Sequence, residues 1–374
     1  MALNATLFCV CSFIVSFLIV YVSIPSIVNV ARIKGLFDEP GIRKCHFQKT
    51  PNLGGIAIFA AIIITTGLFL DARTNRELLY LLASLTVVFF IGIKDDILII
   101  APSKKLLGEI IAALILIVLG NLRFTSLHGF LGIYNIDYTS SVLLSCFVMI
   151  VIINGFNLID GIDGLAAGIG ILVSLTFGSW FFLIGSINYA VMCTIVSGAL
   201  LAFFGFNVFG SVNKIFMGDT GSLIIGFIIS VFVIQFNEAN LTYTGPFSFQ
   251  AAPAISFGFL IIPLFDTLRV FILRVSKGQS PFRPDMNHLH HRVLKLGFSH
   301  AEATVLISGV NIFFILLMFT FQSMGLIVLM LLNITLATVL VLVMELLIKW
   351  QYSDVRRKSN LQVTTMEIKK IKSA

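Results

Sequence analysis

The chain has 374 residues, of which 58% are hydrophobic and 11% are charged, and its formal net charge is +7. A soluble domain carries about a quarter charged residues, so this composition excludes an ordinary soluble protein. No basic soluble domain is recognisable, and we therefore expect no nucleic-acid partner. Four of the five cysteines lie in apolar runs and Cys45 lies in a basic loop, which does not indicate a disulfide framework.

Apolar stretches of about 17–25 residues, the length that crosses a bilayer core, recur along the whole chain. We predict an all-α integral membrane protein with about eleven transmembrane helices. The first stretch has no basic segment before it and is longer than a signal-peptide core, so it is expected to be a retained span. The predicted spans are Leu3–Val28, Leu53–Leu70, Leu78–Ile93, Leu106–Leu119, Val142–Ile159, Leu165–Ile184, Tyr189–Phe209, Ser222–Phe236, Ile255–Leu273, Ala303–Phe321 and Gly325–Ile348.

Basic residues concentrate in alternate loops. Only Arg73, Arg76 and Arg123 fall in one set of loops, and the other 22 of the 25 Lys and Arg fall in the opposite set or the C-terminal tail. The positive-inside rule then places the N-terminus outside and the C-terminus in the cytoplasm. We divide the chain into a polytopic membrane catalytic domain, residues 1–350, and a basic cytoplasmic tail, residues 351–374, which we expect to be loosely ordered.

Carboxylates gather at the predicted cytoplasmic ends of the spans, where a charge is costly unless it has a function. Asp95 and Asp96 follow the third span, and two adjacent carboxylates repel unless a cation or a shared proton intervenes. A polar helix end facing water is the alternative. A one-sided ring of acids suits Mg²⁺, which takes oxygen ligands from one or two carboxylates and from substrate phosphates.

The segment Asn154–Gly164 has the highest density of polar groups. Asn154, Asn157 and Asp160 are spaced three apart and share a helix face, while Asp163 follows in a glycine-containing turn. Amide and carboxylate groups on one face suit the edge of a uracil ring and ribose hydroxyls. A polar helix–helix contact or a turn cap is the alternative.

Two further segments carry candidate chemistry. Met217–Ser222 contains Asp219 at the start of a span, where backbone N–H groups favour phosphate, although a simple N-cap also explains it. Arg283–Arg292 contains the only histidine cluster, which suits phosphate or metal-bound substrate, with zinc or a structural role as alternatives. The first cytoplasmic loop, with Asp38 and His46, is a weak signal by itself.

These motifs, in this order on alternate cytoplasmic loops, resemble the polyprenyl-phosphate N-acetylhexosamine-1-phosphate transferases of the glycosyltransferase 4 type. The resemblance runs from Asp38 to about Ser299. The sequence His288–Leu289–His290–His291 resembles the undecaprenyl-phosphate N-acetylglucosamine-1-phosphate transferase branch rather than the muramyl branch. Family members initiate envelope polymers such as O-antigen of lipopolysaccharide, enterobacterial common antigen and teichoic acid linkage units.

The resemblance implies a multi-pass enzyme of the bacterial inner membrane with its active site on the cytoplasmic face. Its substrates would be a UDP-sugar and a polyprenyl phosphate, its metal Mg²⁺ with Mn²⁺ as an alternative, and its assembly state a monomer or a homodimer within membrane lipid. Asp95 and Asp96 would act at the lipid phosphate, one as a base, and Asp219 with Asp95 would hold the metal. The implied substrate-binding residues are Asn154, Asn157, Asp160, Asp163, Lys105, Arg283, His288, His290, His291, Asp38 and His46.

Two positions depart from the family pattern. Glu109 stands where glutamine is common, and Met286 stands where a basic residue often follows the aspartate before the histidine cluster. Arg283 is a candidate to compensate for Met286. The expected reaction is transfer of N-acetylglucosamine-1-phosphate, with another UDP-N-acetyl sugar as the alternative donor. A transporter is the rival class, but transporters place their acids near the bilayer midplane, and a silent scaffold would have lost acids from the motifs.

Overall fold

The computed structural model describes residues 2–37, 50–71, 76–98, 100–279 and 288–372. Within them the chain is almost entirely helical, as predicted. The elements are α1 (Ala2–Lys34), α2 (Gly54–Phe69), α3 (Arg76–Leu98), α4 (Pro102–Leu114) with a π-helical turn Ile115–Leu119, β1 (Ser126–Phe130), β2 (Ile133–Asn135), α5 (Tyr138–Ile159), α6 (Leu165–Leu183), α7 (Ile187–Phe209), α8 (Gly218–Thr242), α9 (Ala252–Phe259), α10 (Ile261–Ser276), α11 (Leu289–Lys295), α12 (His300–Thr320), a 3₁₀ turn Gln322–Met324 and α13 (Leu326–Lys372).

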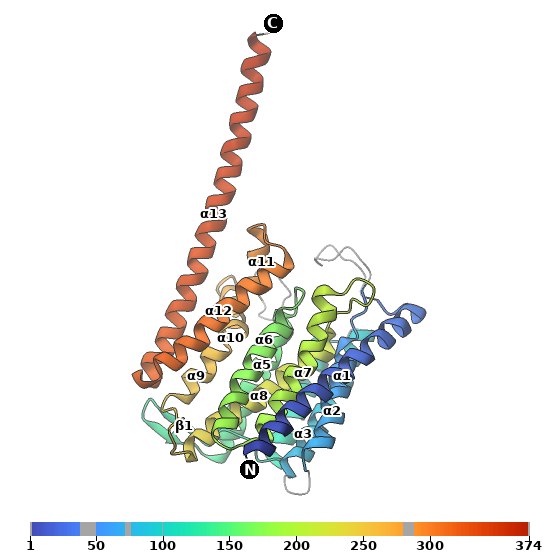
Figure 1. Cartoon of the computed structure of the whole chain (residues 1–374). Helices are drawn as coiled ribbons and strands as arrows, with labels where there is room; N and C mark the ends of the chain where they lie inside the picture. The colour runs from blue at the N-terminus through green and yellow to red at the C-terminus, as the bar shows by residue number, and fades with distance from the viewer. Residues whose placement is uncertain (1, 38–49, 72–75, 99, 280–287, 373–374) are drawn as a thin grey trace.

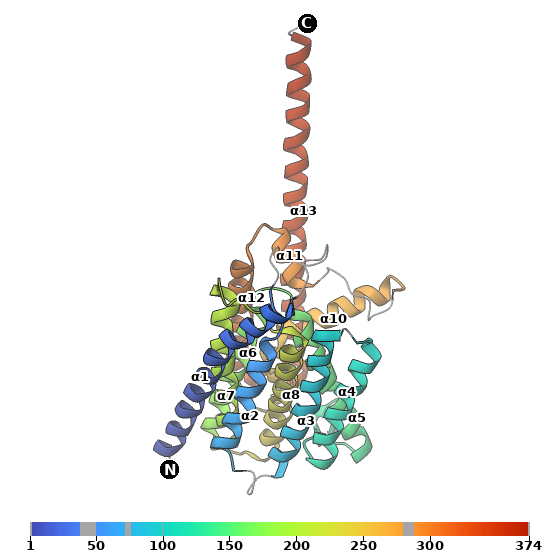
Figure 2. The same cartoon turned by 90° about the vertical axis from the view of Figure 1, so that its right-hand side faces the viewer.

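The long helices form a bundle around α8. Side chains of α8 are buried along most of its length, because α3 and α5 pack on it and α2, α6 and α9 contact it as well. α1 lies at the edge of the bundle against α7 (Figure 1). α1 begins at one end of the bundle and α13 projects from the other, in both views (Figures 1 and 2).

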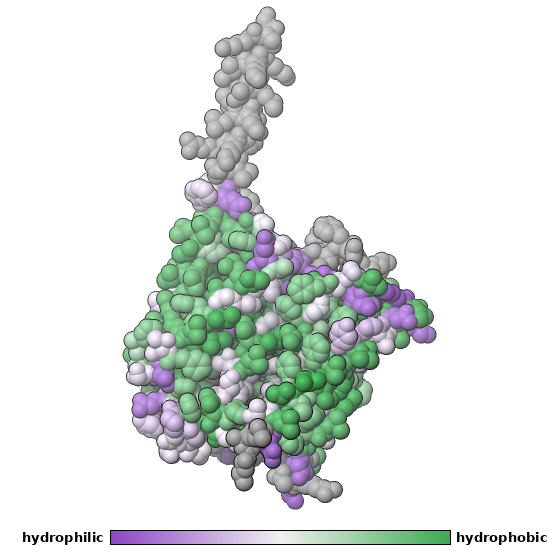
Figure 3. All heavy atoms as spheres, viewed as in Figure 1, coloured by the Kyte–Doolittle hydropathy of each residue, from purple (hydrophilic) through white to green (hydrophobic). Residues whose placement is uncertain are grey.

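The outer surface is that of a membrane protein. On the face seen in Figure 3, a broad apolar band covers the bundle, with hydrophilic residues towards its two ends. Eight of the described helices are long and apolar enough to span a bilayer, and the bent pair α9–α10 would make nine. The predicted spans Leu53–Leu70 and Leu106–Leu119 correspond to the shorter α2 and to α4 with its π turn. An all-α membrane protein is therefore confirmed, while the number eleven and the orientation in the membrane stay predictions.

The predicted span Ile255–Leu273 is broken. α9 and α10 meet at an angle of 85° around Leu260. Pro263 lacks an N–H group and its ring clashes with the carbonyl four residues earlier, that of Phe259, which ends α9. The released Phe259 carbonyl accepts a hydrogen bond from Asn311 of α12 at 3.2 Å. The break directs α10 away from the bundle axis (Figure 2).

The predicted boundary at residue 350 falls within a helix, and the expected loose order of the tail stays a prediction. α13 continues as one helix through Lys372, because no glycine or proline follows Gly325 to interrupt it. A second departure is the antiparallel hairpin of β1 and β2 between α4 and α5, which adds a small sheet to the otherwise helical fold.

Candidate active site

The predicted site residues lie on several helices that meet at one end of the bundle. α3 and α5 end there and α8 begins there, so their acidic and amide side chains come together although they are far apart in sequence. This is the end from which α13 projects (Figure 1). The short α11, which carries the histidines, lies at the same end.

Asp96 holds the first turn of α8. Its Oδ1 accepts from the backbone N–H of Asp219 at 2.7 Å, and its Oδ2 accepts from the N–H and hydroxyl of Thr220 at 3.0 and 2.5 Å. Asp96 thus caps α8 from a neighbouring helix, as an N-cap side chain would from within the chain. The N–H groups of Asp219 and Thr220 are thus bonded to Asp96 and are not open to phosphate, while the expectation of phosphate at this helix start stays a prediction.

Glycines make this approach of α3 and α8 feasible. Gly218 has a positive φ of 72°, and a Cβ there would lie 2.7 Å from Asp96 Oδ1. A Cβ at Gly92 would lie 2.4 Å from the Cα of Thr220. Both positions therefore require glycine for α8 to begin against α3.

Asp95 and Asp96 are adjacent but serve different partners. Asp95 faces Lys105 of α4, whose ammonium lies 3.1 Å from Asp95 Oδ2 and 2.5 Å from Asp219 Oδ1. The same oxygen of Asp219 accepts from Asn157 Nδ2 at 2.6 Å, and that amide also donates to Ser222 at 2.9 Å. Lys105 and Asn157 thus fix the position of the Asp219 carboxylate.

The turn between α5 and α6 carries the remaining acids. Asp163 pairs with Lys214 at 2.7 Å and lies 3.5 Å from His300 Nδ1. Asp160 has no hydrogen bond or ion pair with any other described side chain. Burial, followed by repulsion from Asp219, Asp96 and Asp163, raises the pKa of Asp160 well above its usual value. Repulsion from the neighbouring carboxyl groups thus favours the neutral form of Asp160 unless a cation binds nearby.

The histidine arm, residues His288–Lys295, is held by α10. Asp266 accepts from the backbone N–H of Leu289 at 3.1 Å, lies 3.0 Å from His288 Nδ1 and pairs with Arg269 at 2.7 Å. His288 is thus the N-cap of α11 and points at Asp266. Asp266 orients the arm in the way that a capping carboxylate orients a helix.

His290 is the buried member of the arm. Its side chain is 2% exposed, and neither ring nitrogen has a hydrogen-bond partner among the described residues. A Cβ at Gly161 would lie 2.2 Å from His290 Nε2, so the imidazole rests directly on the α5–α6 turn. Burial, followed by the neighbouring His291, lowers the pKa of His290 to about 3. The imidazole is therefore neutral at physiological pH and can donate one hydrogen bond and accept another.

The arrangement fits Mg²⁺ better than zinc. Among the described residues, no three His, Cys, Asp or Glu side chains converge on one point, as a structural zinc site requires. Mg²⁺ needs only one or two carboxylates and completes its shell with water and phosphate oxygens. Asp219 and Asp95 share Lys105 as their cation, and the carboxyl groups of Asp160 and Asp219 repel each other, which a bound cation would relieve. The residues present therefore suit a divalent cation held mainly by Asp219.

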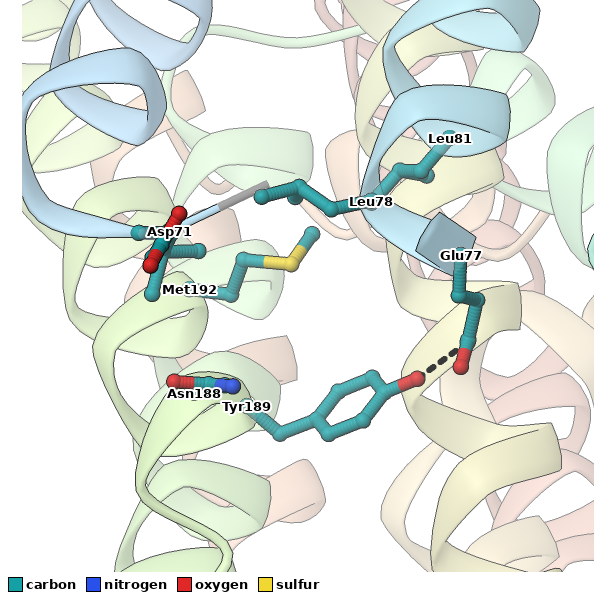
Figure 4. Close-up of a pocket in the computed structure, with 8 residues that line it drawn as sticks. Asp71, Glu77, Leu78, Leu81, Asn188, Tyr189 and Met192 are labelled. Atoms are coloured by element: carbon teal, nitrogen blue, oxygen red, sulfur yellow. Dashed lines mark hydrogen bonds between the residues drawn. The ribbon is translucent and has the colours of Figure 1, made fainter. Parts of the chain in front are cut away.

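The opposite end of the bundle carries a separate group of polar residues. Asp71, Glu77, Asn188 and Tyr189 line a small cavity, in which the Tyr189 hydroxyl donates to Glu77 (Figure 4). The cavity measures about 20 Å³, and a single water molecule needs at least about 10–15 Å³. This cavity by itself is too small to enclose a nucleotide sugar.

Comparisons with known proteins identify the family of this chain. The model of glycosyl transferase family 4 matches residues 78–237. The undecaprenyl-phosphate alpha-N-acetylglucosaminyl 1-phosphate transferase of Escherichia coli O157:H7 is 33% identical over 283 residues, which cover 75% of each chain. The decaprenyl-phosphate N-acetylglucosaminephosphotransferase of Mycolicibacterium smegmatis is 32% identical over 307 residues, covering 73% of this chain and 72% of that protein. The chain belongs to glycosyl transferase family 4.

The family assignment predicted from the motif order is thus confirmed, and the chain is an enzyme, a phosphotransferase of glycosyl transferase family 4. The family match includes Asp95, Lys105, Asn154 and Asp219, and the histidine arm lies beyond it. Asp38, His46 and Arg283 lie outside the described residues, so their predicted roles stay predictions.

Several contacts in this family 4 site were not predicted. Thr220 and Asn52 contact Asp96, and Lys214 pairs with Asp163. Glu109 accepts from Asn154 Nδ2 at 2.7 Å and is 1% exposed. Glu109, one turn after Lys105, could be recognised in the sequence as a departure from the family pattern. Its partner Asn154 on α5 could not be recognised there.

Proposed function

We propose that this enzyme transfers N-acetylglucosamine-1-phosphate from UDP-N-acetylglucosamine to undecaprenyl phosphate at the cytoplasmic face of the bacterial inner membrane. An oxygen of the lipid phosphate attacks the sugar-bearing phosphorus, the bond from that phosphorus to the UMP oxygen breaks, and UMP leaves. The product is the lipid-linked pyrophosphoryl sugar that initiates an envelope polysaccharide. The observation that carries the proposal is the carboxylate cluster around Asp219 at one end of a membrane bundle, in a chain similar to enzymes named for this reaction.

In phosphoryl transfer the protein mainly positions the substrates and neutralises charge. Bound Mg²⁺ supplies charge neutralisation at the pyrophosphate. In this proposal Asp219 holds the cation, while Asn157 and Lys105 keep Asp219 in place. Asn154 and Asp160, on the same face of α5 or directly after it, contact the nucleoside, and His290 and His291 contact the pyrophosphate or sugar.

The acid pair is expected to serve orientation more than proton removal. The second pKa of a phosphate monoester is about 6, so the lipid phosphate is already largely a dianion at neutral pH. Asp96 is occupied by the first turn of α8 and Asp95 by Lys105. Their proposed role is therefore to hold Asp219 and the cation in the correct position relative to the phosphate of the acceptor.

An apolar cavity offers a place for the acceptor's tail. It measures about 470 Å³ and is lined almost entirely by apolar side chains of α5, α8, α9 and α10, among them Val148, Val151 and Leu264. Val151 lies one turn before Asn154 on α5, and Leu264 lies two residues before Asp266 on α10. The cavity and the polar site thus share two helices, which suits a lipid with an apolar tail and a phosphate head.

The test is UMP release by the purified protein in detergent with undecaprenyl phosphate and Mg²⁺. We expect release with UDP-N-acetylglucosamine, dependent on lipid and on metal. Turnover with only a different UDP-N-acetyl sugar would keep the reaction and overturn the proposed donor. Folded protein that turns over no donor would overturn the proposed function itself.

Filling the cavity should weaken acceptor binding selectively. Val151→Trp is expected to raise the KM for undecaprenyl phosphate by about tenfold and leave the KM for the nucleotide sugar unchanged, since the tail loses apolar area worth over 1 kcal/mol. Farnesyl phosphate, whose tail is short, should be affected less. Val22→Trp, on the exposed face of α1, is the control. Equal loss with both acceptors would contradict a role for this cavity in binding the tail.

A further inference from the structure

Lys105 lies where a divalent cation would be expected. Its ammonium is 3.1 Å from Asp95 Oδ2 and 2.5 Å from Asp219 Oδ1, and its side chain is only 14% exposed. Charge-assisted hydrogen bonds of this kind are among the stronger ones in proteins. A cation that uses Asp219 as its ligand therefore has to compete with this ammonium.

Glu109 is a second candidate partner for the Lys105 ammonium. Glu109 lies four residues later on the same helix, the spacing at which helical side chains are neighbours, and it interacts electrostatically with Lys105. Glu109 is 1% exposed, and its Oε1 has no hydrogen-bond partner among the described residues. An unsatisfied buried carboxylate oxygen is costly, so a partner for it in some state of the enzyme is expected.

The stem of Lys105 allows the change. α4 fixes its backbone, whose N–H bonds to the carbonyl of Ala101, while the flexible four-carbon side chain carries a compact charge that can be redirected. Glu109 is itself held by Asn154 through its other oxygen, at 2.7 Å. A moving lysine would therefore meet a carboxylate that is already fixed.

We propose that Lys105 is a displaceable counter-ion, which holds the carboxylates of Asp95 and Asp219 in the donor-free enzyme and turns towards Glu109 when the divalent cation and the donor bind. The inference rests on the proposed function, because it takes Asp219 to be the metal ligand. It adds that metal alone binds weakly and that donor and metal bind cooperatively. The enzyme then keeps its metal site closed to a cation that arrives without substrate.

The experiment is Mn²⁺ titration of the purified full-length protein in detergent, without nucleotide, followed by the electron paramagnetic resonance signal of free Mn²⁺. Lys105→Met should bind Mn²⁺ about tenfold or more tightly than the wild type, since the competing charge-assisted bonds are gone. Lys104→Met is the matched control, because it removes the same charge one residue away from an exposed position. It should bind like the wild type.

The role of Glu109 as the second partner of Lys105 is tested by substituting Glu109 with and without the lysine. Glu109→Gln keeps an oxygen for Asn154 and removes the second site for the ammonium, so Mn²⁺ binding should weaken about tenfold by the same reasoning. In a Lys105→Met background the same substitution should have little effect, because coupled residues are not additive. If Glu109→Gln weakened Mn²⁺ binding just as much in the Lys105→Met background, the proposed movement of Lys105 between Asp219 and Glu109 would be overturned.

The outcomes separate the inference from the function on which it rests. If Lys105→Met leaves Mn²⁺ affinity unchanged or weaker while Asp219→Asn abolishes binding, the counter-ion role is overturned and the metal assignment stands. If Asp219→Asn binds Mn²⁺ as well as the wild type, the metal assignment fails too. Tighter binding by Lys105→Met alone, with Lys104→Met unchanged, supports the proposal.

Discussion

Asp219→Asn should reduce turnover by about a thousandfold or more. A bound cation contributes several kcal/mol of charge stabilisation to the transition state, and each 1.36 kcal/mol corresponds to about a factor of ten in rate. The substitution keeps the shape of the side chain, so Asn157 and Ser222 remain packed around it. The measurement is UMP release at saturating donor over a range of Mg²⁺ concentrations.

The matched control is Asp137→Asn at the other end of the bundle. Asp137 caps α5 by accepting from the N–H of Ser140 at 3.0 Å, and asparagine caps a helix nearly as well. This variant should keep wild-type turnover and Mg²⁺ dependence. If Asp219→Asn retained more than about a tenth of the activity at the same Mg²⁺ concentration, a loss of under 1.4 kcal/mol, Asp219 would not be the main metal ligand.

The position of the site was predictable because it follows from topology. Alternating basic loops assign one end of every span to the same side, and the acids of three motifs then fall at that end. The structure brings Asp95, Asn157 and Asp219 together at one end of α3, α5 and α8. Span length and charge asymmetry are properties of the sequence alone, so no tertiary contact was needed to infer this convergence.

It was not predictable that Asp95 and Asp96 would contact different partners. Successive residues of a helix point about 100° apart, so adjacent carboxylates reach different neighbours. The partners, Lys105 on α4 and Thr220 on α8, are defined by how three helices pack. The same limit applies to Asp266, whose partner His288 lies 22 residues later in the chain.

The break between α9 and α10 has a local cause in the sequence, a proline, that a hydropathy profile does not detect. The apolar stretch reads as one span, but Pro263 removes the helix hydrogen bond to Phe259. As a result α10 carries both cavity-lining residues and Asp266, which holds the histidine arm. The proline in the sequence was sufficient to predict a kink, whereas its 85° angle depends on the packing around Leu260.

Gly161→Ala should lower kcat/KM by about a hundredfold, although it adds a single methyl group. Gly161 has no positive φ, so its backbone accepts alanine, and the effect would come from the new Cβ. That atom would lie 2.2 Å from Nε2 and 2.7 Å from Cε1 of His290, whose side chain is 2% exposed. The histidine arm would have to move, and a displacement of about 1 Å of a positioning group can cost about a hundredfold in rate.

Two variants distinguish this steric effect from a general disturbance. Gly205→Ala on α7, where a Cβ would meet nothing within 4 Å, should leave activity unchanged. His290→Ala removes the imidazole, so adding Gly161→Ala to it should cost little more, since the two residues act through one contact. If the double variant instead lost a further hundredfold, Gly161 would be needed for close approach of the substrate to the α5–α6 turn. The comparison therefore decides whether Gly161 must lack a side chain because of the histidine arm or because of the bound donor.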